Sequence, residues 1–68
     1  MAKLIINSED RDFECLPQTL SELLLQLGVN EATVVAEIDG SIIARGTFCS
    51  TPLKDGQVVE LVRFVGGG

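Results

Sequence analysis

The chain has 68 residues, 46% of them hydrophobic, which predicts one small globular domain with a modest core. Ten acidic against five basic residues give a net charge of −5, which argues against nucleic acid or an anionic membrane as partner, because phosphate binding needs clustered cations. The absence of histidine excludes histidine-dependent catalysis and histidine-ligated metal within this chain. No signal peptide or membrane-length apolar run is visible, so we expect a soluble cytoplasmic protein.

The first residues predict an antiparallel β-hairpin. Residues 3–7 are rich in β-forming side chains, residues 8–10 are a polar break, and residues 11–15 alternate with period two. We expect the apolar members of this hairpin to face the core, namely Leu4, Ile6, Phe13 and Cys15, and Asp12 and Glu14 to face outward.

A helix is predicted over residues 19–27. Thr19 and Glu22 match a capping box, in which both side chains satisfy free amides at a helix start. Four leucines follow at spacings that form one apolar stripe: Leu20, Leu23, Leu24 and Leu27. Gly28 stands where a C-terminal glycine cap belongs, with Val29 after it.

The second half predicts three more strands. They are residues 33–38, 41–44 and 58–64, with an Asp39-Gly40 hairpin turn, an irregular stretch at 45–53 that has a helical turn near 47–50, and a turn at 54–57. The order is therefore β-β-α-β-β-β. This predicts an α+β fold in which one main helix packs on one face of a mixed β-sheet.

The last strand predicts a docking surface. Its alternation places Val59 and Leu61 inward and leaves Val58, Val62 and Phe64 outward, joined by Ile5 of the first strand. An exposed apolar set on so small a monomer suggests a binding surface. Alternatively, a loop or a second copy covers it, or strand twist buries Phe64.

The end of the sequence predicts the reactive group. We divide the chain into a domain at 1–64 and a flexible glycine tail at 65–68. Because glycine has no Cβ that would obstruct it, we expect this tail to fit into a narrow enzyme cleft. Its reactive group is the α-carboxylate of Gly68, which needs activation, most simply by ATP. Because no P-loop is present, we expect a second protein to bind that ATP. The alternative is a frayed end or a cloning scar.

Residues 53–60 and 62–68, together with the element order and the Asp39-Gly40 hairpin, resemble the ThiS family of thiamin-biosynthesis sulfur carriers. The resemblance implies a ubiquitin-like β-grasp fold. It implies that a ThiF-type adenylating enzyme activates the terminal glycine with ATP, and that sulfur from a donor such as a cysteine desulfurase converts it to a thiocarboxylate. Thiazole synthase then takes up the sulfur. The chain itself would be no enzyme and would bind no cofactor.

The same resemblance assigns roles to individual residues. Gly68 would be the adenylated and thiocarboxylated residue, Gly67 the other half of the terminal pair, and Gly66 a spacer. The resemblance implies that Phe64 and Val62 lie on the surface that docks the activating enzyme and that Phe48 lies in the core. Strand alternation adds Val58 and Ile5, and Arg63 is added because it lies close to the tail. The expected partner-binding residues are therefore Phe64, Val62, Val58, Ile5, Arg63 and Gly66.

Three other functions remain open from the sequence. A molybdopterin synthase small subunit would share the fold and the terminal chemistry, and a ubiquitin-like modifier would join its terminal glycine to lysines. A β-grasp interaction module with an inert tail would be a different class of protein.

Several other residues are read as structural. We interpret Cys15 and Cys49 as packing residues, with a single disulfide left open. Arg45 is a further candidate for partner contact. The hairpin's acidic side chains indicate a solvated face, or else steering toward a basic partner: Glu9, Asp10, Asp12 and Glu14.

Overall fold

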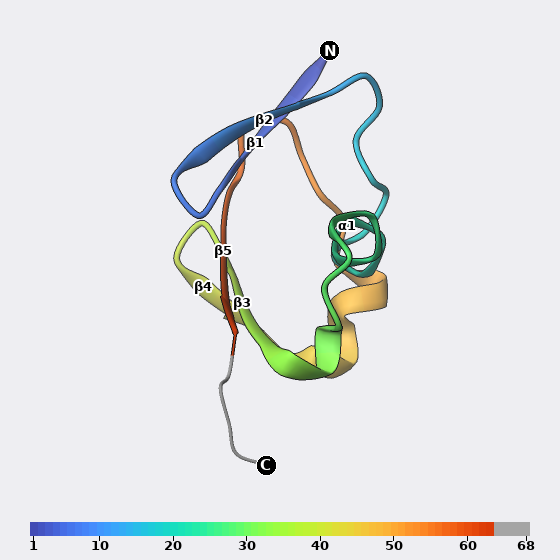
Figure 1. The fold of residues 1–68 in the computed structure, drawn as a ribbon, viewed down its shortest axis with the longest axis vertical. Coiled ribbons are helices and arrows are strands. Elements are labelled where there is room, and N and C mark those ends of the chain that lie inside the picture. The colour runs from blue at the N-terminus through green and yellow to red at the C-terminus, as the bar shows by residue number, and fades with distance from the viewer. Residues whose placement is uncertain (64–68) are drawn as a thin grey trace.

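The structure, a computed structural model, describes residues 1–63, which form a five-stranded sheet with one α-helix against one face (Figure 1). The elements are β1 (Ala2–Ile6), β2 (Glu9–Phe13), α1 (Leu20–Leu27), a 3-10 turn (Glu31–Thr33), β3 (Val34–Ile38), β4 (Ser41–Ile43), a 3-10 segment (Arg45–Ser50) and β5 (Val58–Arg63). The predicted β-β-α-β-β-β order is confirmed. The predicted strand residue Phe64 and the tail at 65–68 lie outside the described residues.

The last strand lies in the middle of the sheet. The strand order is β2-β1-β5-β3-β4, with β1 and β5 parallel and every other neighbouring pair antiparallel. The sheet is therefore mixed, as predicted. Strand β5 pairs with β1 at Val58 and Val59 and with β3 from Val59 to Arg63, so the ladder with β3 holds its backbone as far as the last described residue.

Local signals set both ends of α1. The Thr19 hydroxyl accepts a hydrogen bond from the Glu22 backbone N–H at 3.3 Å. Gly28 adopts a left-handed conformation with φ of 73°, and the Val29 N–H bonds the Leu24 carbonyl at 2.9 Å. The helix has only eight residues, and the described part of the chain contains no helix with the length and apolar character needed to cross a bilayer.

The core lies between α1 and the inner face of the sheet. The helix contributes three buried leucines, and the 3-10 segment at Arg45–Ser50 contributes Phe48, which is 1% exposed. The predicted core position of Phe48 is thus confirmed. The buried hydrophobic residues are Leu4, Ile6, Leu20, Leu23, Leu24, Val34, Ala36, Ile38, Phe48, Leu53 and Val59.

The first hairpin differs from its prediction. The chain turns at Asn7 and Ser8, whose φ angles of 49° and 69° are positive, so β2 already begins at Glu9. Phe13 then pairs with Ala2, where β1 starts, and the ladder has no partner for later residues. The expectation that Cys15 faces the core is therefore wrong, because Cys15 lies beyond the strand and is exposed. Phe13 does pack against the core.

Candidate functional site

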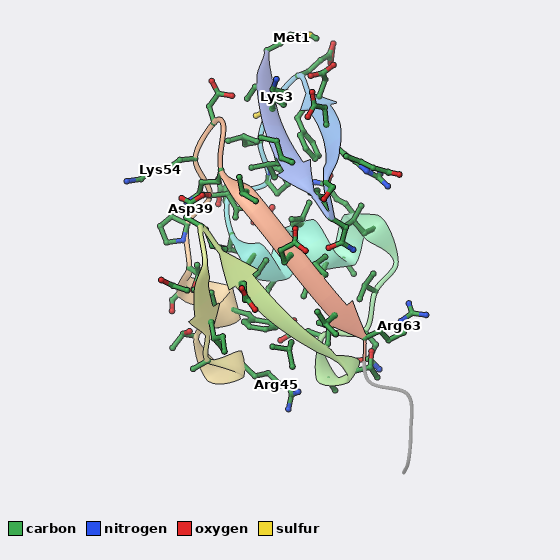
Figure 2. All side chains as sticks on the ribbon, turned by 90° about the vertical axis from the view of Figure 1, so that its left-hand side faces the viewer. Met1, Lys3, Asp39, Arg45, Lys54 and Arg63 are labelled. Atoms are coloured by element: carbon green, nitrogen blue, oxygen red, sulfur yellow. The ribbon has the colours of Figure 1, made fainter. Side chains whose placement is uncertain are left out.

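Strand β5 presents different chemistry on its two faces. Val59 is fully buried and Leu61 is half-buried against the core, whereas Val58 is 41% and Val62 is 57% exposed. The predicted alternation of this strand is confirmed. Figure 2 looks onto the uncovered face of the sheet, on which β5 runs between β1 and β3.

Neighbouring strands extend the exposed apolar surface. Ile5 of β1 lies opposite Val58, and Val35 of β3 lies opposite Val62. We call these four residues the outer-face patch. Sequence analysis missed Val35, although the alternation of β3 was sufficient to place it on this face. Beyond β3, Ile42 of β4 is 71% exposed and lies opposite Glu37.

Two carboxylates separate the two apolar pairs of the patch. Glu60 lies between Val58 and Val62 on β5, and it stands directly opposite Glu37 of β3. Both glutamates are half-buried. Neither side chain forms an ion pair or hydrogen bond with another residue in 1–63. The face therefore alternates apolar, acidic and apolar chemistry along β5.

The β1–β2 side of this face is acidic as well. Asp10 lies opposite Ile5, and Asp12 lies opposite Lys3. The Lys3 ammonium reaches the Asp10 carboxylate at 3.5 Å, and both side chains are exposed, so this pair contributes little to stability. Acidic side chains therefore outnumber the one basic side chain, Lys3, on this part of the face.

Arg63 points to the other face of the sheet. It lies opposite the buried Val34 and therefore projects toward the helix side, away from Val62. There it borders an open hollow of about 450 Å³, together with Arg11 and the apolar side chains of Leu61 and Leu27. The predicted partner-binding residues of β5 thus divide between the two faces.

Arg45 has an internal role. Its Nε donates to the Glu31 carbonyl at 3.2 Å and its Nη2 to the Val34 carbonyl at 3.5 Å. The guanidinium thereby ties the 3-10 segment that it begins to the start of β3. Its side chain is nevertheless exposed, and its contact with a partner stays a prediction.

The cysteines are free thiols on the surface. Both Cys15 and Cys49 are exposed, and the structure contains no disulfide between them. Neither packs in the core, so the interpretation of these two cysteines as packing residues is wrong.

The predicted reactive end lies outside the described residues. This applies to Phe64, Gly66, Gly67 and Gly68. The structure does place Arg63, the residue before them, at the end of the central strand, away from Lys54 (Figure 2).

Comparison with known proteins shows which family model and which solved structures match this chain. The sequence model of the ThiS family matches residues 4–68, nearly the whole chain and the whole glycine tail. A crystal structure of the thiamine biosynthesis protein ThiS from Geobacter metallireducens is 34% identical, with a TM-score of 0.82, and the match covers 97% of this chain and 99% of that one. A solution structure from the same organism gives a TM-score of 0.77.

Two longer proteins contain a similar stretch. The thiazole synthase of Paramagnetospirillum magneticum is 36% identical over 66 residues, and that of Magnetococcus marinus is 33% identical over 66 residues. The match covers 97% of this chain, which spans 20% of the length of each synthase. The expected ubiquitin-like β-grasp fold is confirmed by the ThiS structures.

Proposed function

This chain belongs to the ThiS family, and we propose that it serves thiamin biosynthesis as a sulfur carrier rather than as an enzyme. The observation that carries this proposal is the family match, which runs through Gly68 and therefore includes the group that would react. The names of the similar proteins support the thiamin pathway over molybdopterin synthesis.

The proposed chemistry takes place at the Gly68 carboxylate. The carboxylate oxygen attacks the α-phosphorus of ATP, pyrophosphate leaves, and an acyl adenylate forms. A hydrosulfide then attacks the acyl carbon and AMP leaves, so one oxygen of the glycine is replaced by sulfur. If the donor is a persulfide, a thiol must afterwards reduce the sulfur–sulfur bond to release the thiocarboxylate. Gly67 and Gly66 let the backbone enter a narrow cleft, since no Cβ obstructs it.

The partners supply the catalysis in this proposal. A ThiF-type adenylating enzyme binds and uses the ATP, and a cysteine desulfurase or a similar donor supplies sulfur. Thiazole synthase receives the sulfur. Its place among the partners is supported by two thiazole synthases that contain a stretch similar to this chain.

The outer-face patch is proposed as the docking surface for the adenylating enzyme. Val58 and Val62 are exposed, Ile5 and Val35 are half-buried beside them, and Val62 lies near the described end of β5, so a bound partner would bury this surface while it receives Gly68. Phe64, which follows the described end of β5 in the sequence, is proposed as part of the same docking surface.

An exchange assay tests the function. With the adenylating enzyme, wild-type carrier should support exchange of labelled pyrophosphate into ATP, because adenylation is reversible. A variant that lacks Gly68 should support none, although it should still compete with wild type for the enzyme. Exchange at the wild-type rate without Gly68 would refute the proposal.

A further inference from the structure

Glu37 and Glu60 stand opposite each other on neighbouring strands, and no cation in residues 1–63 forms an ion pair with either. Like charges directly opposite each other in an antiparallel pair destabilise a sheet. Both carboxylates are half-buried, which reduces their screening by water. The other cations at known positions lie elsewhere. Lys3 pairs with Asp10, and Arg45 binds backbone carbonyls. Arg11 and Arg63 lie on the helix side. Lys54 lies in the turn before β5 and points away from the sheet (Figure 2).

The surroundings of the pair suit one kind of occupant. The Ile5–Val58 contact lies on one side of the glutamates along β5, and the Val35–Val62 contact lies on the other. A lysine or arginine buries its methylene stem on apolar surface while its charged head reaches a polar group. Such a side chain could pack its stem on Val58 or Val62 and donate to both carboxylates, and the arginine fork is well suited to two acceptors.

We propose that Glu37 and Glu60 together form the acceptor for one basic side chain of the adenylating enzyme, with the outer-face patch enclosing its stem. This inference rests on the proposed function and adds the residue chemistry by which the partner is recognised. The charge of the chain supports the choice, because a net charge of −5 favours a basic partner. Free of its partner, the carrier tolerates the repulsion, and the bound cation relieves it.

The proposal predicts opposite effects on stability and on recognition. Glu37→Gln and Glu60→Gln should each raise the urea midpoint of unfolding, because they remove the repulsion. In the pyrophosphate-exchange assay the same variants should raise the apparent KM for the carrier about fivefold to tenfold, with kcat within about twofold. A purely structural role would lower both stability and activity, or change neither.

Glu14→Gln is the matched control. It alters the net charge by the same amount at an exposed position outside the sheet, so its KM should stay within about twofold of wild type. Glu60→Asp should retain most of the affinity because it keeps the charge. In a double-mutant cycle, the loss in the doubly substituted Glu37→Gln, Glu60→Gln variant should be smaller than the sum of the single losses, since both acids serve one cation.

Three results would overturn the inference. The first is a wild-type KM in Glu37→Gln and Glu60→Gln, and the second is an equal rise in Glu14→Gln. The third is unchanged adenylation with weakened binding to thiazole synthase, which would assign the acid pair to that partner instead. In all three cases wild-type carrier is still adenylated, so the proposed function stands. If wild type supports no exchange at all, the function and the inference fail together.

Discussion

The side-chain amide of Asn7 pairs with the backbone of Leu61 as a strand residue would. Its Oδ1 accepts from the Leu61 N–H at 2.7 Å, and its Nδ2 donates to the Leu61 carbonyl at 3.2 Å. Strand β1 ends at Ile6, so this one side chain continues the parallel contact between β1 and β5 for a further step. The central strand is thereby held near the point at which the tail begins.

Asn7 should accordingly stabilise the domain through its side chain. Asn7→Gly keeps the positive φ of this turn but removes both hydrogen bonds, so we expect a loss of about 1–2 kcal/mol in the free energy of unfolding. Ser8→Gly is the control, because Ser8 has a positive φ in the same turn. Urea unfolding measures both. Equal effects of the two substitutions would show that the amide contributes nothing.

Gly28 should be required for its backbone conformation alone. A Cβ at this position would meet no atom within 4 Å, but φ is +73°. Gly28→Ala should therefore cost about 1 kcal/mol, with no clash to repair. Gly46→Ala provides the comparison, since its Cβ also meets nothing and its φ lies outside the left-handed range. It should be neutral or stabilising by about 0.4–1 kcal/mol. Thermal melting of both variants tests the difference.

Val62 should matter for docking and not for folding. Val62 is 57% exposed on the outer face, so Val62→Asp should leave the melting temperature nearly unchanged. It should raise the apparent KM for adenylation about tenfold, because it puts a charge into an apolar contact. Leu25→Asp, at an 80% exposed position of α1, makes the same kind of change away from the patch. A similar KM in the two variants would place the docking surface elsewhere.

The exposed thiols should be dispensable for sulfur transfer. Cys15 and Cys49 should both react promptly with a thiol reagent such as DTNB in the native protein. The protein with Cys15→Ser and Cys49→Ser should accept sulfur as wild type does, since the proposed acceptor is a carboxylate. Loss of sulfur transfer in this variant, with its fold intact, would instead indicate a persulfide on one of the thiols.

Structural features that depend on residues close together in the sequence, such as helix ends and strand faces, could be predicted. The helix follows from Thr19, the leucine spacing and Gly28, and the faces of β5 follow from its alternation. The first hairpin could not be placed correctly, because the polar run after Asn7 conceals that Glu9 and Asp10 belong to a strand. A turn of two residues with positive φ leaves little trace in composition when neither is glycine.

Contacts between residues that are far apart in the chain could not be predicted from the sequence. The Asn7–Leu61 pairing joins positions 54 apart, and the opposition of Glu37 and Glu60 requires the register of β3 against β5. Alternation within each strand gives the face of every residue, but it does not give the partner across the ladder. Three of the four residues of the outer-face patch were predicted from the sequence, and Val35 was missed although the alternation of β3 gives its face.

Mass spectrometry of the intact carrier tests the central claim most directly. After incubation with ATP, the adenylating enzyme and a sulfur donor, the mass should rise by one exchange of oxygen for sulfur, and fragmentation should place the change at Gly68. Omission of ATP should abolish it. A mass change located at Cys15 or Cys49, or an unmodified Gly68 under complete conditions, would contradict the account.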